Sequence, residues 1–207
     1  MHRKRNNFLW ILIFITIHGA CKMDKKAPEQ ETTPSAVLVA FRDGQAVLSD
    51  STTVAIPHWG DTTYTIFYCV RHAEKRKDQG DNPALTAEGE ARAGRLGNIL
   101  KGVRIDQVST TNYKRTVQTA EIVRGIAGNA PAETYPPANQ DIWLENKLNE
   151  GSGKHYFIVG HQNTVPRLLN QLKGGTEFGD IPEDDHGRFY IAVTKGIGQT
   201  EVLEFRY

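Results

Sequence analysis

The sequence has few of the residues that provide disulfides or metal sites. Its 207 residues include only two cysteines, Cys21 and Cys69, and two methionines. It contains no HExxH pattern and no carboxylate cluster typical of a metal site, so we expect neither a metal nor a cofactor. The formal net charge is only +1, which argues against nucleic acid as a partner. The composition, with 39% hydrophobic and 24% charged residues, is that of one ordinary globular domain.

The sequence also lacks an apolar run long enough to cross a bilayer, which takes about 17 to 25 residues. Its N-terminal run, residues 8–17, follows three basic residues and precedes Gly19 and Ala20. This pattern predicts a secretory signal peptide over residues 1–20. Its removal takes away three basic residues and no acidic one, which changes the formal net charge from +1 to −2.

Cys21 stands directly after this segment, an arrangement that resembles the lipobox of bacterial lipoproteins. His18 departs from that pattern, which usually has Leu or Val there. The resemblance implies lipidation of Cys21, attachment to a membrane and an extracytoplasmic location, in the periplasm or cell envelope. The alternative is a plain secreted protein in which Cys21 is incidental. With Cys21 lipidated, Cys69 would have no thiol partner for an intramolecular disulfide.

Residues 21–35 are mostly polar and predict a flexible tether, because they bury too little apolar surface to offset the entropy of ordering. Two short apolar runs follow, Ala36 to Phe41 and Gln45 to Leu48, joined through Asp43-Gly44, a strong hairpin signal. We therefore expect residues 36–63 to be an N-terminal hairpin extension of a main domain spanning residues 64–207.

From residue 64 the chain alternates between strand and helix patterns, which predicts an α/β fold with a mostly parallel sheet. The expected strands are 64–70, 105–109 and 155–159, and the expected helices are 86–100, 113–127, 139–148 and 164–172. Residues 188–193 and 201–206 predict an antiparallel hairpin at the sheet edge.

Two of the expected strands each deliver a histidine at their C-terminal end, His72 in "TIFYCVRH" and His161 in "HYFIVGH". Ligands bind at this end of the strands in open α/β sheets, so both should face one crevice. Arg71 adjoins the first histidine, and Arg115 stands near the start of an expected helix, where backbone N–H groups attract anions. Guanidinium groups pair with phosphoryl oxygens without needing a metal, so the set predicts a phosphate site.

Four segments, "VRHAEK", "LTAEGEARA", "STTNYKRTVQTAE" and "VGHQNT", resemble in order the motifs of the histidine phosphatase superfamily (small branch-one type). The resemblance implies a phosphoglycerate mutase-like fold, a three-layer sandwich whose mostly parallel central sheet is flanked by helices. It implies that His72 accepts the phosphoryl group as phosphohistidine, while Arg71, Arg115 and His161 hold its oxygens. If a backbone carbonyl accepts a hydrogen bond from Nδ1–H of His72, Nε2 is free to attack.

The resemblance does not supply the general acid. Larger relatives use a Glu from an insertion for which this chain has no counterpart, and Gln162 stands where other relatives have Asp. Glu74 is the nearest acid in the sequence, although a loop carboxylate more often pairs with a neighbouring base; an easily expelled leaving group would need no acid.

Cys69 lies inside an apolar strand and has Lys75, not Arg, six residues later, so we interpret it as packing rather than as a nucleophile. His58, His155 and His186 are interpreted as surface or packing histidines.

The sequence thus predicts a metal-independent phosphatase that hydrolyses phosphomonoesters or related phosphorylated small molecules. The alternative is a lipoprotein that binds a phosphorylated ligand without turnover. A mutase is disfavoured because the short segment between Arg115 and His161 leaves little lid to retain an intermediate.

Overall fold

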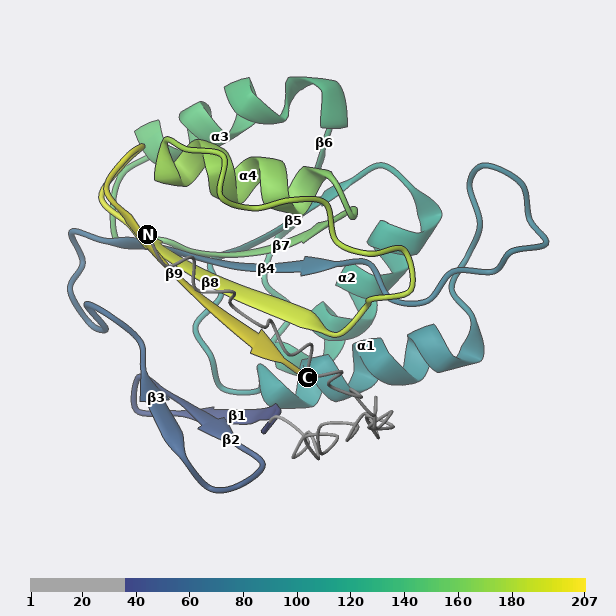
Figure 1. The fold of residues 1–207 in the computed structure, drawn as a ribbon, viewed down its shortest axis with the longest axis horizontal. Coiled ribbons are helices and arrows are strands. Elements are labelled where there is room, and N and C mark those ends of the chain that lie inside the picture. The colour runs from purple at the N-terminus through teal and green to yellow at the C-terminus, as the bar shows by residue number, and fades with distance from the viewer. Residues whose placement is uncertain (1–35) are drawn as a thin grey trace, which may run out of the picture. The chain divides into compact units, whose positions relative to one another are not determined.

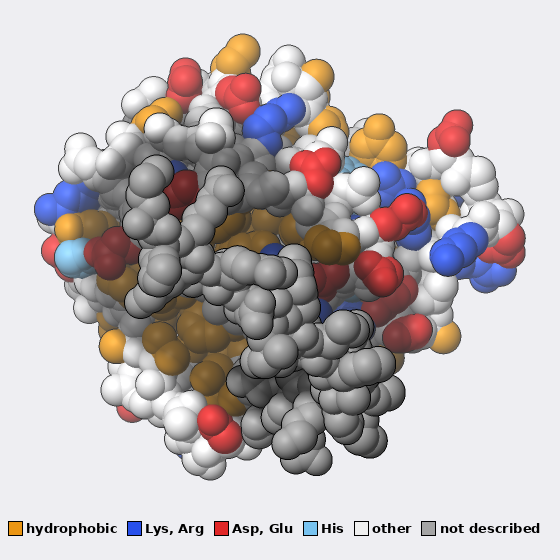
Figure 2. Space-filling view, in the orientation of Figure 1, with side chains coloured by type: hydrophobic (Ala, Val, Ile, Leu, Met, Phe, Trp, Pro, Cys, Tyr) orange, Lys and Arg blue, Asp and Glu red, His pale blue; other side chains and the backbone are white. Residues whose placement is uncertain are grey.

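The computed structural model describes residues 36–207, which lie within one compact unit, Ser35–Tyr207. The predicted signal peptide, the tether and Cys21 fall outside the described residues. Among the described residues, no helix has both the length and the apolar character needed to cross a membrane. Where Figure 2 leaves side chains uncovered, both acidic and basic groups are visible on this face.

A six-stranded sheet in the order β6-β5-β7-β4-β8-β9 forms the centre of the fold (Figure 1). Four neighbouring strands are parallel: β6 (Ala132–Tyr135), β5 (Gln107–Thr111), β7 (His155–Gly160) and β4 (Thr65–Arg71). The hairpin of β8 (Arg188–Thr194) and β9 (Thr200–Arg206) adds two antiparallel strands on the other side of β4. The sheet is therefore mostly parallel, as predicted.

Helices cover both faces of this sheet and make the three layers (Figure 1). Helices α1 (Ala87–Ile99) and α2 (Lys114–Ala127) lie on one face, and α3 (Gln140–Asn149) and α4 (Thr164–Lys173) on the other. Helix α1 begins at a side-chain cap, because Thr86 Oγ1 accepts a hydrogen bond of 3.0 Å from the Gly89 N–H. Helix α4 buries Leu168, Leu169 and Leu172, whose helical spacing places them on one face.

Strand β4 is buried along its whole length and contributes to both halves of the core. Because side chains alternate along a strand, Tyr68 and Val70 join the cluster that includes α1 and α2, whereas Phe67 and Cys69 join the cluster that includes α3 and α4. The continuous apolar run before His72 is therefore explained by helices packed on both faces of this central strand.

Residues 36–55 form a second, antiparallel sheet of three strands, β1 (Leu38–Arg42), β2 (Gln45–Leu48) and β3 (Thr53–Ala55). The first two strands are the expected hairpin, while β3 was not predicted because three residues are too few to show a pattern. Leu38 and Ala46 belong to the same core cluster as helices α1 and α2.

Every strand and helix expected from residue 64 onwards is present, with bounds that differ by at most two residues. The structure also contains strand β6 and a short 3-10 helix, Pro137–Asn139, between the helices expected at 113–127 and 139–148, where no element was predicted. Strand β6 is an edge strand with the sequence AETY and one fully buried side chain, so it carries no apolar run that a sequence reading could detect.

Candidate active site

His72 follows directly after the buried strand β4 and is itself only 2% exposed. Its backbone N–H donates to Gly160 O at 3.0 Å, which continues the pairing of β4 with β7. Its Nδ1 lies 2.7 Å from Ala73 O; a carbonyl can only accept, so Nδ1 carries the proton and Nε2 has the free electron pair. The backbone contact expected for a nucleophilic Nε2 is thus present.

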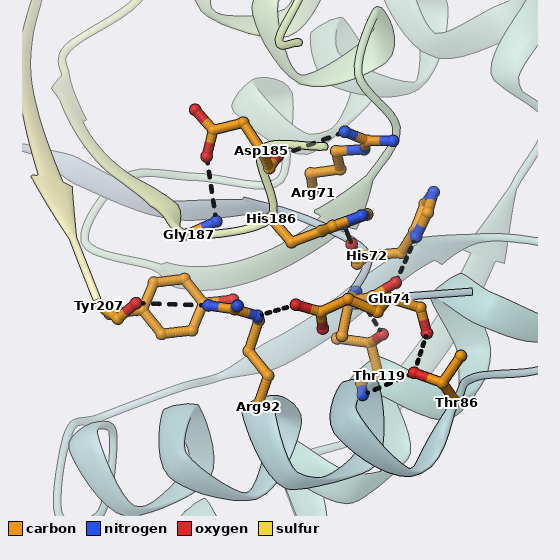
Figure 3. A network of polar contacts seen from close by, with 12 residues as sticks. Arg71, His72, Glu74, Thr86, Arg92, Thr119, Asp185, His186, Gly187 and Tyr207 are labelled. Atoms are coloured by element: carbon orange, nitrogen blue, oxygen red, sulfur yellow. Dashed lines mark hydrogen bonds and ion pairs between the residues drawn. The ribbon is translucent and has the colours of Figure 1, made fainter. Parts of the chain in front are cut away.

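Two side chains, those of Thr119 and His186, hold the backbone around His72. The Ala73 N–H donates to Thr119 Oγ1 at 3.1 Å, and that hydroxyl donates to Arg115 O at 2.7 Å. From the other side, Nδ1 of His186 donates to His72 O at 2.8 Å (Figure 3). The position of the imidazole is therefore determined by helix α2 and by the segment that precedes β8.

His186 was interpreted as a surface or packing histidine, and with 9% exposure it is a buried one. It also contacts the backbone of His72, and the centroids of the two rings are 5.6 Å apart. The sequence offered only its position just before the apolar run of β8. Since β8 is the neighbour of β4, residues leading into β8 can reach those leaving β4.

His161 follows strand β7, and its ring centroid lies 5.5 Å from that of His72. Its Nε2 is 2.7 Å from Thr111 Oγ1 at the end of β5, and its Nδ1 is 3.4 Å from Arg115 Nη2. The two histidines and Arg115 therefore meet at the carboxyl ends of β4, β7 and β5, as the strand pattern predicted.

Burial holds both histidines in the neutral form. It lowers the pKa of His72 to about 2, with the nearby charge of Arg71 acting in the same direction and the hydrogen bond to Ala73 opposing it. Burial likewise lowers the pKa of His161 to about 4, helped by the guanidinium groups of Arg115 and Arg71. A neutral imidazole is the nucleophilic form, so His72 is ready to attack at neutral pH.

These groups border a cavity of about 290 Å³ at the end of the sheet. Its lining consists of His72, Lys75, Tyr113, Arg115, Pro137, His161, Gln162, Asn163 and Thr164. No carboxylate is among these residues, whereas two are cationic. Helix α4 also begins here, so the positive end of its dipole faces the cavity.

The two arginines differ in how they relate to this cavity. Arg115 lines it, with its guanidinium carbon 4.6 Å from the ring centroid of Tyr113. Arg71 is fully buried behind it: Nη1 donates to Pro182 O at 2.6 Å and Nη2 to Gln162 Oε1 at 3.3 Å. The Nε atoms of both arginines are buried without a hydrogen-bond partner among the described residues. Such unpaired donors favour an incoming anion, because leaving them unpaired is costly.

Glu74 is not brought to this cavity. Its carboxylate forms an ion pair with Arg92 Nε at 2.6 Å and is turned toward helix α1, away from the His72 ring (Figure 3). It borders a separate cavity of about 620 Å³, whose lining also includes Lys75 and His186. Glu74 and His72 therefore line different cavities, which have Lys75 in common.

Cys69 is completely buried in β4, and burial raises the pKa of its thiol, so its interpretation as a packing residue is confirmed. Among the described residues, no three His, Cys, Asp or Glu side chains come together as the ligands of a metal ion would.

The α/β fold, with a mostly parallel sheet between two layers of helices, matches the phosphoglycerate mutase-like fold of histidine phosphatases of known structure. Residues 67–137, about a third of the chain, match the family model described as the histidine phosphatase superfamily (branch 1). This match covers Arg71, His72 and Arg115 but ends before His161. No curated protein matches the chain significantly.

Several solved structures share the fold. A protein histidine phosphatase, SixA, complexed with tungstate is 22% identical, with a TM-score of 0.57 over 68% of this chain and 96% of that one. The mycobacterial glucosyl-3-phosphoglycerate phosphatase is 9% identical, with a TM-score of 0.56 over 70% and 98% of the two chains. Phosphoglycerate mutase from Plasmodium falciparum is 18% identical, with a TM-score of 0.50 over 69% and 90%. These likenesses establish the fold, and two of the three similar proteins are phosphatases.

Proposed function

We propose that this protein is a histidine phosphatase that hydrolyses phosphomonoesters or related phosphorylated compounds through a phosphohistidine on His72. The observation that carries the proposal is one cavity that combines a neutral His72 with a free Nε2, His161, the guanidinium of Arg115 and no lining carboxylate. The match of residues 67–137 to the superfamily model supports it.

In the proposed reaction, Nε2 of His72 attacks phosphorus and the bond from phosphorus to the leaving group breaks. Arg115 and the start of helix α4 stabilise the negative charge on the phosphoryl oxygens, so that no metal is required for charge neutralisation. Water then attacks phosphorus, the phosphorus–nitrogen bond breaks, and inorganic phosphate and neutral His72 are released. Arg71, though outside the cavity lining, supports the same phosphate site through its unpaired Nε and its contact with Gln162.

The leaving group determines which substrates suit this cavity. Because Glu74 pairs with Arg92 and no carboxylate lines the cavity, we do not assign Glu74 as the proton donor. We infer a preference for leaving groups that depart without a proton from an acidic side chain, such as phenolates or the imidazole of a phosphohistidine. The likeness to a protein named as a histidine phosphatase supports the second of these classes.

A labelling experiment tests the proposal. The full chain is mixed with an aryl phosphate that carries a labelled phosphoryl group, and the reaction is quenched with denaturant. We expect a base-stable, acid-labile label on the protein, located on His72 and absent from a His72→Asn variant. The control is Cys69→Ala, which removes the other nucleophile of the same segment and should label normally. Saturable phosphate binding without label or turnover would instead favour a binding protein.

We further propose that the protein is a lipoprotein attached to a membrane outside the cytoplasm through Cys21. The basic and apolar residues before Cys21 support this proposal. The full chain expressed in a bacterium should need detergent for extraction, whereas a Cys21→Ala variant should be released without it. Equal release of the two proteins would contradict the proposed anchor.

A further inference from the structure

A chain of hydrogen bonds leads from His161 through the hydroxyls of Thr111 and Thr116 to two backbone carbonyls. Thr111 Oγ1 lies 2.7 Å from His161 Nε2 and 3.0 Å from Thr116 Oγ1. Thr116 Oγ1 in turn lies 2.7 Å from Thr111 O and 2.9 Å from Tyr113 O. Both threonines are 0% exposed, so bulk solvent does not reach these contacts.

The carbonyl end of this chain of hydrogen bonds sets the position of each proton. Carbonyl oxygens only accept, and both of them lie closer to Thr116 Oγ1 than Thr111 Oγ1 does, so we direct the single proton of the Thr116 hydroxyl to a carbonyl. Its oxygen can then only accept from the Thr111 hydroxyl, which leaves Thr111 Oγ1 as an acceptor toward His161. The proton between Thr111 and His161 therefore belongs to Nε2 of the imidazole.

The opposite side of the ring leads to the same assignment. Nδ1 of His161 lies 3.4 Å from Arg115 Nη2, and a guanidinium only donates. A neutral imidazole has one proton and one electron pair, so Nε2–H faces Thr111 while the electron pair of Nδ1 faces Arg115. Since Arg115 and His161 both line the cavity, Nδ1 is the nitrogen available to a ligand.

We propose that Thr111 is a positioning residue that holds His161 as the Nε2–H tautomer and so presents Nδ1 to the cavity as a proton acceptor. Its importance for turnover rests on the proposed phosphatase function, whereas the tautomer does not. In this role His161 would receive a hydrogen bond from a protonated phosphoryl oxygen or from the attacking water, rather than donate one from its neutral form. His72 thus presents Nε2 to the cavity and His161 presents Nδ1, because the other nitrogen of each ring donates its proton to a protein oxygen.

The test reads the ring nitrogens directly. In ¹⁵N-labelled full chain at pH 7 without substrate, NMR shifts of the His161 ring, assigned with a His161→Gln variant, should show a protonated Nε2 and an unprotonated Nδ1. Thr111→Ser keeps the hydroxyl and should give the same pattern. Thr111→Val keeps the shape but removes the hydroxyl, and should give a mixture of tautomers.

A second variant gives a stronger prediction. Thr116→Val removes the acceptor of the Thr111 hydroxyl proton, which can then be donated to Nε2 of His161. The population should shift toward the Nδ1–H tautomer, whereas Thr116→Ser should keep the original one. In turnover of an aryl phosphate, Thr111→Val should lose about 10- to 100-fold in kcat/KM, as when an orienting partner of a functional histidine is removed, and Thr111→Ser should recover most of the loss.

The outcomes separate this proposal from the proposed function. A wild-type His161 protonated on Nδ1 would overturn it without reference to any variant, and so would an unchanged tautomer in a folded Thr111→Val protein. The wild-type tautomer can be as expected while His72 takes up no phosphoryl label and aryl phosphates are not hydrolysed. In that case the positioning role of Thr111 stands and the phosphatase proposal fails.

Discussion

Helix α1 contains two glycines that test how firmly the segment after His72 is held. An added Cβ at Gly89 would lie 2.3 Å from the carbonyl oxygen of Glu74 and 3.0 Å from its nitrogen. At Gly94, five residues along the same helix, an added Cβ would meet nothing within 4 Å. The first substitution therefore pushes against the backbone two residues beyond His72, whereas the second enters open space.

The pair of variants isolates the energy of this contact. Replacing glycine by alanine in a helix normally stabilises by about 0.5–1 kcal/mol, a gain that both variants share. The difference between their free energies of unfolding is then the cost of overpacking at Gly89. We expect Gly89→Ala to be about 1–3 kcal/mol less stable than Gly94→Ala. The Glu74 carbonyl also accepts the Thr86 N–H at 2.9 Å, so moving it weakens the start of helix α1 as well.

Urea unfolding followed by circular dichroism, together with kcat/KM for an aryl phosphate, measures both consequences. Gly94→Ala should be at least as stable as the wild type and equally active. Gly89→Ala should be less stable and, because the His72 ring depends on the backbone of residues 72–74, also less active. Equal stability and activity of the two variants would refute the claim that close packing on helix α1 holds this segment in place.

Three further predictions follow from the charges at the site. Because the pKa values of His72 and His161 lie below the usual 6.5, the unfolded chain binds more protons than the folded one under mildly acidic conditions. The free energy of unfolding, measured with urea, should therefore fall by about 2 kcal/mol for each of these two histidines between pH 7 and pH 5, and His72→Gln should remove its own share of about 2 kcal/mol. Glu74→Gln should keep most of the activity on aryl phosphates but lose about 1–3 kcal/mol of stability through the contact with Arg92; a large loss of kcat in a stable variant would restore Glu74 as a candidate acid. Across aryl phosphates, kcat/KM should rise steeply as the pKa of the released phenol falls, and a flat dependence would indicate a proton donor that we have not identified.

Much of the fold and the choice of the central residues could be predicted from local pattern. The apolar run of β4 ending at His72, the similar run of β7 ending at His161 and the stripe on α4 report which residues are buried and where each element ends. Parallel strands place their carboxyl ends together, so the meeting of His72, His161 and Arg115 followed from the strand pattern. The burial of Cys69 followed from its place inside such a run.

The partners of these residues could not be predicted in the same way. His186 contacts the His72 backbone across 114 residues of sequence, and Thr111 contacts His161 across 50. Arg71 donates to Gln162 and Pro182 and is not itself part of the cavity lining, and Glu74 pairs with Arg92 on helix α1. The short strand β6, with its single buried side chain, was missed for a related reason, since it is recognisable only by its pairing with β5.

The sequence by itself determined the α/β class, the strands that deliver His72 and His161, and the inert character of Cys69, because these depend on periodicity and burial over a few neighbouring residues. Only the tertiary structure decided that Glu74 is paired away from the cavity, that His186 holds the His72 backbone and that Thr111 orients His161. Those contacts depend on strand order and on side-chain direction, which bring distant segments within hydrogen-bonding distance and leave no local trace in the sequence.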